Sequence, residues 1–206
     1  MFQSPGPGRL VAICGVDGVG KTTLISRLSR ETSLLGASTL TKTDKTAFNA
    51  VQKLSGSEHG GWKAWNEGSF AEAIAIAASI DFLNHYSKNI LPAIEANNVV
   101  ITDRYHLCYA AYLACVKSRV NPQLLFQRIM LPDLIIILDA LPESIASRLA
   151  RRGGATDDEN PELSAKLRLA YRQLAPSFSK RYTIINADID ADAVYAQAIR
   201  EIESIF

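Results

Sequence analysis

A glycine-rich stretch, GVDGVGKTT at residues 15–23, comes directly after the apolar run LVAIC at residues 10–14. Its order of glycine, four residues and then glycine, lysine and threonine matches the P-loop pattern, which here consists of Gly15, Gly20, Lys21 and Thr22. In this pattern the backbone N–H groups turn inward around a phosphate at the start of a helix. The stretch therefore predicts a nucleoside-triphosphate phosphate site between a strand and a helix.

The alternative is a strand-to-helix turn that happens to be rich in glycine. The flanks argue against it, because residues 10–14 read as a buried parallel strand and the leucines after Lys21 fall roughly on one helical face. We expect Lys21 to reach the β- and γ-phosphates and the Thr22 hydroxyl to bind Mg²⁺. The residues predicted to bind the nucleotide are Gly15, Asp17, Gly18, Val19, Gly20, Lys21, Thr22 and Thr23.

Apolar runs alternate with amphipathic stretches along the chain, which predicts an α/β fold with a parallel sheet and helices on both faces. The expected strands cover residues 10–14, 38–42, 98–102, 134–138 and 182–186. The segment from Ser69 to Asn97 reads as helical, with small and aromatic residues near one face. We interpret residues 1–9 as a flexible lead-in and residues 10–206 as a single P-loop kinase domain.

Composition limits the partners of this chain of 206 residues. The formal net charge is +1, which argues against a dominant surface for nucleic acid or anionic membrane, and the longest weakly polar stretch, AIAIAASI, is too short to span a bilayer. The three cysteines show no C-x-x-C spacing and the three histidines no zinc spacing. Reduced, buried thiols and a cytoplasmic location are the expectation.

The sequence DRYH follows the predicted strand at 98–102, at the strand end where open α/β sheets bind ligands. Asp103 can hold Mg²⁺ or accept a proton, and Arg104 can bind phosphate oxygens with two nitrogens. The alternative is a local ion pair that only fixes the turn. Asp139, after the strand at 134–138, is the competing metal-side aspartate, although its neighbours read as a helix start.

The next predicted helix ends with Arg148, Arg151 and Arg152, just before the polar stretch GGATDDENPE. Basic residues at a helix end suit the helix dipole without any function. However, arginines on a flexible loop also screen charge on a transferring phosphoryl group. We therefore expect a mobile lid over about residues 152–161 and keep Arg148 and Arg152 as candidate catalytic arginines, beside Lys21, Asp103 and Arg104.

Three stretches in this order, GVDGVGKTT, NVVITDRYHLCYAAYLA and PDLIIILDALPESIASRLARRG, resemble thymidylate kinase and its relatives, from about Leu10 to the final helix. The resemblance implies a five-stranded parallel sheet, ATP with Mg²⁺, a homodimer and a small-molecule acceptor that is a nucleotide. It assigns the acceptor sugar to Asp17, the acceptor phosphate to Arg104 and the transferred group to a lid arginine. It also places Asp103, Tyr105 and Tyr112 on the acceptor side.

The sequence departs from that family only on the acceptor side. TKTDKTAF stands where the family has Pro-Gly-Gly-Thr, and Asp81-Phe82 stands where it has Asp-Arg, so a guanidinium is missing at Phe82. Leu113 removes an amide, and the lid shows DDEN without the family's Asp-Arg. Either a lysine such as Lys45 or Lys53 substitutes for the arginine, or a less charged acceptor stacks on Phe82 and on Trp62 or Trp65.

Three hypotheses follow. The first is an ATP- and Mg²⁺-dependent kinase that phosphorylates a nucleoside monophosphate, with thymidylate as the leading acceptor. The second is a kinase on the same scaffold for another small molecule, such as a sugar, an aminocyclitol or a modified nucleoside. The third is a P-loop GTPase, for which TKTD at residues 41–44 imitates a guanine motif but follows the P-loop too soon.

Replacing the P-loop lysine tests the phosphate site directly. We expect Lys21→Ala to lower turnover by orders of magnitude and to leave the fold intact, because positioning and charge stabilisation supply most of the rate of phosphoryl transfer. Steady-state kinetics and circular dichroism measure the two effects. A folded variant with a rate near that of the wild type would show that the P-loop interpretation is wrong.

Overall fold

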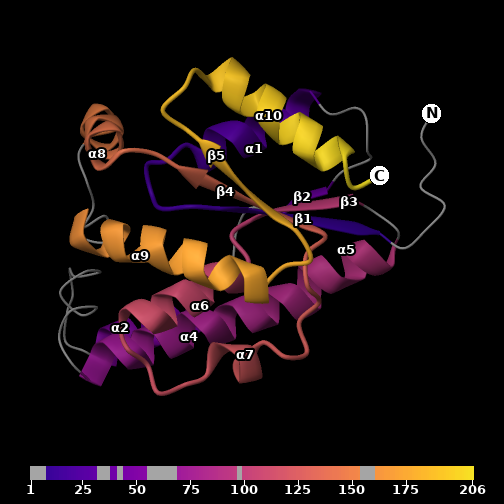
Figure 1. Cartoon of the computed structure of the whole chain (residues 1–206). Helices are drawn as coiled ribbons and strands as arrows, with labels where there is room; N and C mark the ends of the chain where they lie inside the picture. The colour runs from indigo at the N-terminus through magenta and orange to yellow at the C-terminus, as the bar shows by residue number, and fades with distance from the viewer. Residues whose placement is uncertain (1–7, 32–37, 41–43, 55–68, 97–98, 154–160) are drawn as a thin grey trace.

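The computed structural model describes residues 8–31, 38–40, 44–54, 69–96, 99–153 and 161–206 (Figure 1). Its strands form one five-stranded sheet in the order β2-β3-β1-β4-β5, and every neighbouring pair is parallel. The strands are β1 (Arg9–Cys14), β2 (Ser38–Leu40), β3 (Val99–Asp103), β4 (Leu134–Asp139) and β5 (Tyr182–Asn186). The predicted parallel α/β sheet is confirmed, and each strand overlaps an apolar run that predicted one.

Helices cover both faces of the sheet, as expected (Figure 1). One face carries α1 (Lys21–Glu31) and α10 (Ala191–Glu203), which pack against each other. The other face carries α4 (Ser69–His85), α6 (His106–Cys115) and α9 (Pro161–Leu174). The remaining helices are α2 (Thr46–Leu54), α5 (Leu91–Glu95), α7 (Pro122–Leu125), α8 (Pro142–Arg151) and the 3₁₀ turn η2 (Ala175–Ser177). None of the helices in this described part has both the length and the apolar character of a bilayer span.

The long helical segment that starts at Ser69 is less regular than its sequence predicts. Helix α4 passes into a π-helical turn, η1 (Tyr86–Ile90), before α5 begins. A π-helical turn accommodates one more residue than an α-helical turn, so it changes which side chains face the sheet after it. Tyr86 and Ile90 of this turn are buried, and both lie in the main core.

Strand β1 is the centre of the core, because β3 and β4 pair with its two edges. Residues 10–14 have no exposed surface, which explains why they read as an uninterrupted apolar run. In the register of the sheet Ile13 lies opposite Asp103, and Cys14 lies opposite Ile137. The loop after β1 therefore leaves the sheet at the same edge as the residues that follow β3 and β4.

A buried histidine begins α6. His106 is 1% exposed, and its ring packs near Tyr105, Phe126 and Phe178, with centroids 4.5, 6.0 and 5.2 Å away. Neither ring nitrogen has a hydrogen-bond partner within the described residues. Burial without a partner disfavours the charged form and lowers the pKa of His106 from 6.5 to about 3.

This histidine predicts an acid-sensitive fold. The unfolded chain protonates His106 below pH 6.5 and the folded chain only near pH 3, so its contribution to stability is complete above pH 6.5 and is lost as the pH falls. Between pH 7 and pH 5 the free energy of unfolding should fall by about 2 kcal/mol through this residue. Urea unfolding at both pH values measures the difference.

His106→Leu should remove that part of the pH dependence. The matched control is Phe178→Leu, which alters the same aromatic cluster without removing a titratable group and should keep the dependence. Equal pH dependence in the wild type and His106→Leu would contradict the prediction.

Candidate active site

The predicted P-loop is shaped by its approach to β4. Gly15 leaves β1 with φ of +141°, and a Cβ placed there would lie 2.6 Å from the carbonyl oxygen of Leu138. A Cβ on Gly18 would lie 2.9 Å from Leu149 of α8. Position 15 therefore requires glycine for lack of space beside a backbone oxygen, whereas Gly18 is favoured by its positive φ of +77° and by the crowding of the Leu149 side chain.

The ammonium group of Lys21 lies within the loop itself. It donates to the carbonyl oxygen of Val16 at 2.9 Å and lies 3.5 Å from a carboxylate oxygen of Asp17. Only 6% of the lysine is exposed. Burial and then the nearby Arg104 charge lower the pKa of Lys21, while Asp17 and Asp103 oppose them. The Lys21 ammonium group is thus held in the predicted phosphate-binding loop, beside a carboxylate that balances its charge.

Asp17 and Arg104 form an ion pair across the edge of the sheet, between the P-loop and the end of β3. Burial by itself raises the pKa of Asp17, but Arg104 and Lys21 outweigh it and hold the pKa at about 2. Arg104 has φ of +66°, a left-handed conformation that is uncommon outside glycine. Its N–H donates to the carbonyl of Ile13 at 3.0 Å, and its own carbonyl accepts from the Thr102 hydroxyl at 3.0 Å.

Asp103 has the chemistry of a cation ligand. Its Oδ1 is buried and has no hydrogen-bond partner in the described chain. Burial raises the pKa of Asp103, against the lowering effect of Lys21 and Arg104. Thr22, the other predicted Mg²⁺ ligand, is exposed at the start of α1. An unpartnered carboxylate oxygen beside the P-loop lysine fits a Mg²⁺ ion, so both residues remain our predicted metal ligands.

The competing carboxylate, Asp139, already has partners. Its two oxygens accept from Arg168 at 2.5 and 3.1 Å and from Arg172 at 2.6 Å. Burial raises its pKa, but these two arginines of α9 outweigh it and lower the pKa. Asp139 therefore ties the end of β4 to α9, which favours Asp103 over Asp139 as the metal-side aspartate. Sequence reasoning missed both arginines, because they lie on a later helix and match no motif.

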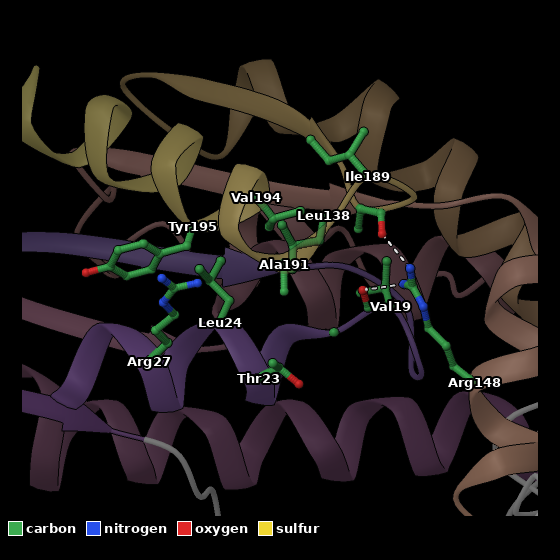
Figure 2. Close-up of a pocket in the computed structure, with 12 residues that line it drawn as sticks. Val19, Thr23, Leu24, Arg27, Leu138, Arg148, Ile189, Ala191, Val194 and Tyr195 are labelled. Carbon is green, nitrogen blue, oxygen red and sulfur yellow. Dashed lines mark hydrogen bonds between the residues drawn. The ribbon is translucent and has the colours of Figure 1, made fainter. Parts of the chain in front are cut away.

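A pocket of about 220 Å³ lies beside the P-loop, between α1 and α10. Val19, Thr23 and Leu24 line one side of it, and Ile189, Val194 and Tyr195 line the other. Figure 2 shows Arg27 and Tyr195 together at one end and Arg148 at the opposite end. The guanidinium carbon of Arg27 lies 4.1 Å from the centroid of the Tyr195 ring. The pocket is apolar between two cationic ends, which suits a flat, polar-edged ring.

Arg148, one of the candidate catalytic arginines, lines this pocket. Its guanidinium donates to the carbonyl of Val19 at 3.1 Å and to that of Ala187 at 2.5 Å, as the dashed lines in Figure 2 show. It therefore connects the P-loop to the segment after β5. Arg152 is exposed at the end of α8, and residues 154–160 of the predicted lid lie outside the described residues.

Two of the predicted acceptor-side rings are buried beneath the site. Phe82 is 1% exposed and stacks on Tyr109 at 4.7 Å, with the edges of Tyr105 and Phe126 against it. The Tyr105 hydroxyl donates to the carbonyl of Met130 at 2.9 Å. A ligand could stack on Phe82 only if this cluster opened. Tyr112 is half-buried on α6. Trp62 and Trp65 lie outside the described residues.

The sequence comparisons agree with this geometry. A profile of the family described as Thymidylate kinase matches residues 13–198. The chain belongs to the thymidylate kinase family. It is 30% identical to a probable thymidylate kinase of Methanococcoides burtonii, over 96% of this chain and 98% of that protein. A thymidylate kinase of Bifidobacterium longum is also 30% identical, over 96% and 98%, and one of Mycoplasmoides gallisepticum is 28% identical, over 93% and 92%.

Membership of the thymidylate kinase family makes the chain a kinase, a phosphotransferase. The P-loop kinase fold is therefore confirmed, and the GTPase alternative has no support. Residues 41–43 of the TKTD stretch, on which that alternative depended, lie outside the described residues. The family match does not test the individual site residues, which stay predictions.

Arg148 offers a test of the pocket. We expect Arg148→Ala to weaken ATP binding by about tenfold, because it removes a charged group that donates to both walls of the pocket. Isothermal titration measures the affinity. The matched control is Arg151→Ala on the same helix, whose guanidinium donates to the Ser147 carbonyl of its own helix at 3.4 Å. Equal losses in the two variants would contradict a specific role for Arg148.

Proposed function

We propose that the chain transfers the γ-phosphoryl group of MgATP to thymidylate, giving thymidine diphosphate. The observation that carries the proposal is the Arg104 guanidinium. Asp17 of the P-loop binds its Nη2, while its Nη1 is buried and has no partner within the described residues. A guanidinium nitrogen that could bind phosphate is thus unpartnered beside the P-loop aspartate, in a chain whose relatives are named thymidylate kinases.

The donor nucleotide fits the part of the site beside α1. Its phosphates would bind to the P-loop backbone and Lys21, and its base would enter the pocket between Arg148 and Tyr195. Gly20 and Thr23 line that pocket and belong to the P-loop, so one nucleotide can reach both. This arrangement supports a purine nucleotide as the donor.

The acceptor would bind on the opposite side of the loop. Arg104 can hold its phosphate with Nη1 while Nη2 remains on Asp17, and the Asp17 carboxylate can accept a hydroxyl of its sugar. Tyr112 of α6 is a further candidate contact for the acceptor. The acceptor oxygen then faces the γ-phosphate, as in-line transfer requires.

The chemistry needs little from the protein beyond position and charge. Lys21 would stabilise negative charge at the transferring group, and Asp103 and Thr22 would hold the metal. When bound, Mg²⁺ neutralises charge on the β- and γ-phosphates. Asp17 favours the protonated state of Lys21, whereas Arg104 disfavours it, and both cations favour the ionised state of Asp17, so the three charged groups form one coupled set.

Family resemblance also supports two further parts of the proposal, a homodimer and a cytoplasmic location. The three cysteines are free, and Cys14 and Cys108 are buried, which suits a reducing compartment.

Phe82 favours a second candidate, a kinase on this scaffold with a less charged acceptor. The buried phenyl ring offers no hydrogen bond where the family has a guanidinium, and Lys45 and Lys53 are the candidate substitutes. Lys45 lies with its ammonium 5.2 Å from the Phe48 ring centroid, at the start of α2.

Steady-state kinetics with ATP and thymidylate test the proposal. We expect kcat/KM in the usual enzyme range of about 10⁴–10⁸ M⁻¹s⁻¹, because Arg104 and the donor site are in place. Uridylate, thymidine and a panel of aminocyclitols serve as alternative acceptors under the same conditions. A value for thymidylate orders of magnitude lower, with normal ATP binding, would overturn thymidylate as the acceptor and favour the second candidate.

A further inference from the structure

We propose that Asp81 is a positioning residue, which fixes the start of α2 against α4 and so places residues 44–45, directly before α2, for acceptor binding. The inference deepens the proposed function and rests on it for the identity of the acceptor. It assigns a role to the one member of the family's Asp-Arg pair that this chain keeps.

The Asp81 carboxylate binds the N-terminus of a neighbouring helix. Asp81 lies on α4, is 6% exposed, and its Oδ1 and Oδ2 accept from the backbone N–H groups of Ala47 and Phe48, each at 2.9 Å. These are the second and third residues of α2, whose N–H groups have no partner within the helix. An N-cap side chain usually serves them, but the preceding residue is Lys45, which has no acceptor atom.

The cap therefore comes from a residue more than 30 positions away in the sequence. A local N-cap would stabilise α2 wherever it lay, whereas Asp81 stabilises α2 only at one place along α4. The charge of the carboxylate also suits the positive end of the α2 dipole. Helix α2 packs along α4, and Phe48 is buried in the main core.

Neighbouring residues connect Asp81 to Arg104 of the predicted acceptor site. The next residue, Phe82, has its ring centroid 5.3 Å from that of Tyr105, and Tyr105 directly follows Arg104. One short path thus links the start of α2 to the guanidinium through Asp81, Phe82 and Tyr105. Residues 44–45, which precede α2, carry both signs of charge and include the candidate acceptor lysine Lys45.

The first test separates acceptor binding from donor binding. We expect Asp81→Asn to raise the KM for thymidylate by about tenfold or more and to leave the KM for ATP within about twofold, because only the acceptor side shifts. Amide hydrogen exchange at Ala47 and Phe48 should accelerate in the same variant. Asp81→Ala should show both effects more strongly, while Asp81→Asn guards against a variant that fails to fold.

Glu72→Gln is the matched control. Glu72 lies on the same helix and its Oε1 also accepts from backbone, at 2.6 Å from the Arg119 N–H, and from the Ser118 hydroxyl at 2.7 Å. It contacts the connection between α6 and α7 and not the N-terminus of α2. Its KM values for both substrates should stay near those of the wild type. Equal effects of Glu72→Gln and Asp81→Asn on the acceptor KM would overturn the inference.

A second test distinguishes positioning from simple capping. Lys45→Ser supplies a local N-cap for α2. The double variant Asp81→Ala with Lys45→Ser should therefore recover slow amide exchange at Ala47 and Phe48. Its KM for the acceptor should nevertheless stay above that of the single variant Lys45→Ser. Recovery of the acceptor KM together with the exchange rates would show that α2 needs only a cap, and would overturn the positioning role.

The readouts also separate this inference from the proposed function. If the wild-type enzyme does not phosphorylate thymidylate, the proposed acceptor is overturned. Hydrogen exchange then tests whether Asp81 fixes the start of α2. Unchanged exchange rates in Asp81→Asn refute this contact, and faster rates at Ala47 and Phe48 support it. An active enzyme whose Asp81 variants keep both KM values refutes the inference while the proposed function stands.

Discussion

The parallel pairing of β1 with both β3 and β4 is the constraint on which the rest of the site depends. Residues 10–14 of β1 are fully buried, and the parallel register ends β1, β3 and β4 at the same edge of the sheet. That geometry brings the P-loop against the Leu138 carbonyl of β4 on one side and against Arg104 on the other. Glycine at position 15 follows from the first contact, because no side chain fits there. The positions of Asp17 and Asp103 follow from the second.

The backbone at Arg104 shows what this arrangement costs locally. A non-glycine residue at φ of +66° is destabilised by about 1–2 kcal/mol relative to an ordinary conformation. Two hydrogen bonds to the Arg104 backbone oppose that cost. Its N–H donates to the carbonyl of Ile13, and its carbonyl accepts from the hydroxyl of Thr102. The ion pair with Asp17 opposes it further. The strained turn directs the guanidinium back over the P-loop, whereas a regular continuation of β3 would carry the side chain away from it.

The sequence predicts those parts of the structure that are determined by residues close together in the chain. Buried parallel strands read as apolar runs, and the P-loop and the DRY triplet carry their chemistry in consecutive residues. The π-helical turn at Tyr86–Ile90 has no such signal, because a single extra residue hardly changes an amphipathic pattern. Contacts between helices and strands that are far apart in the sequence could not be predicted either. Asp139 pairs with arginines of α9, and Phe82 is enclosed by rings from α6 and from the segment after α7, so neither environment could be predicted from neighbours in sequence.

The choice of arginine at position 104 follows from the charges around it. Lys21 and Arg104 are balanced by Asp17 and Asp103, and Asp17 stays ionised down to a pH of about 2. A lysine at position 104 would have a single charged nitrogen, for which an acceptor phosphate and Asp17 would compete. The planar guanidinium has separate nitrogens, so Nη2 can keep Asp17 while Nη1 binds phosphate, and the P-loop aspartate holds its position as the acceptor arrives. If the acceptor binds as proposed, the ion pair would orient both side chains for it, because its charges are already present before any substrate binds.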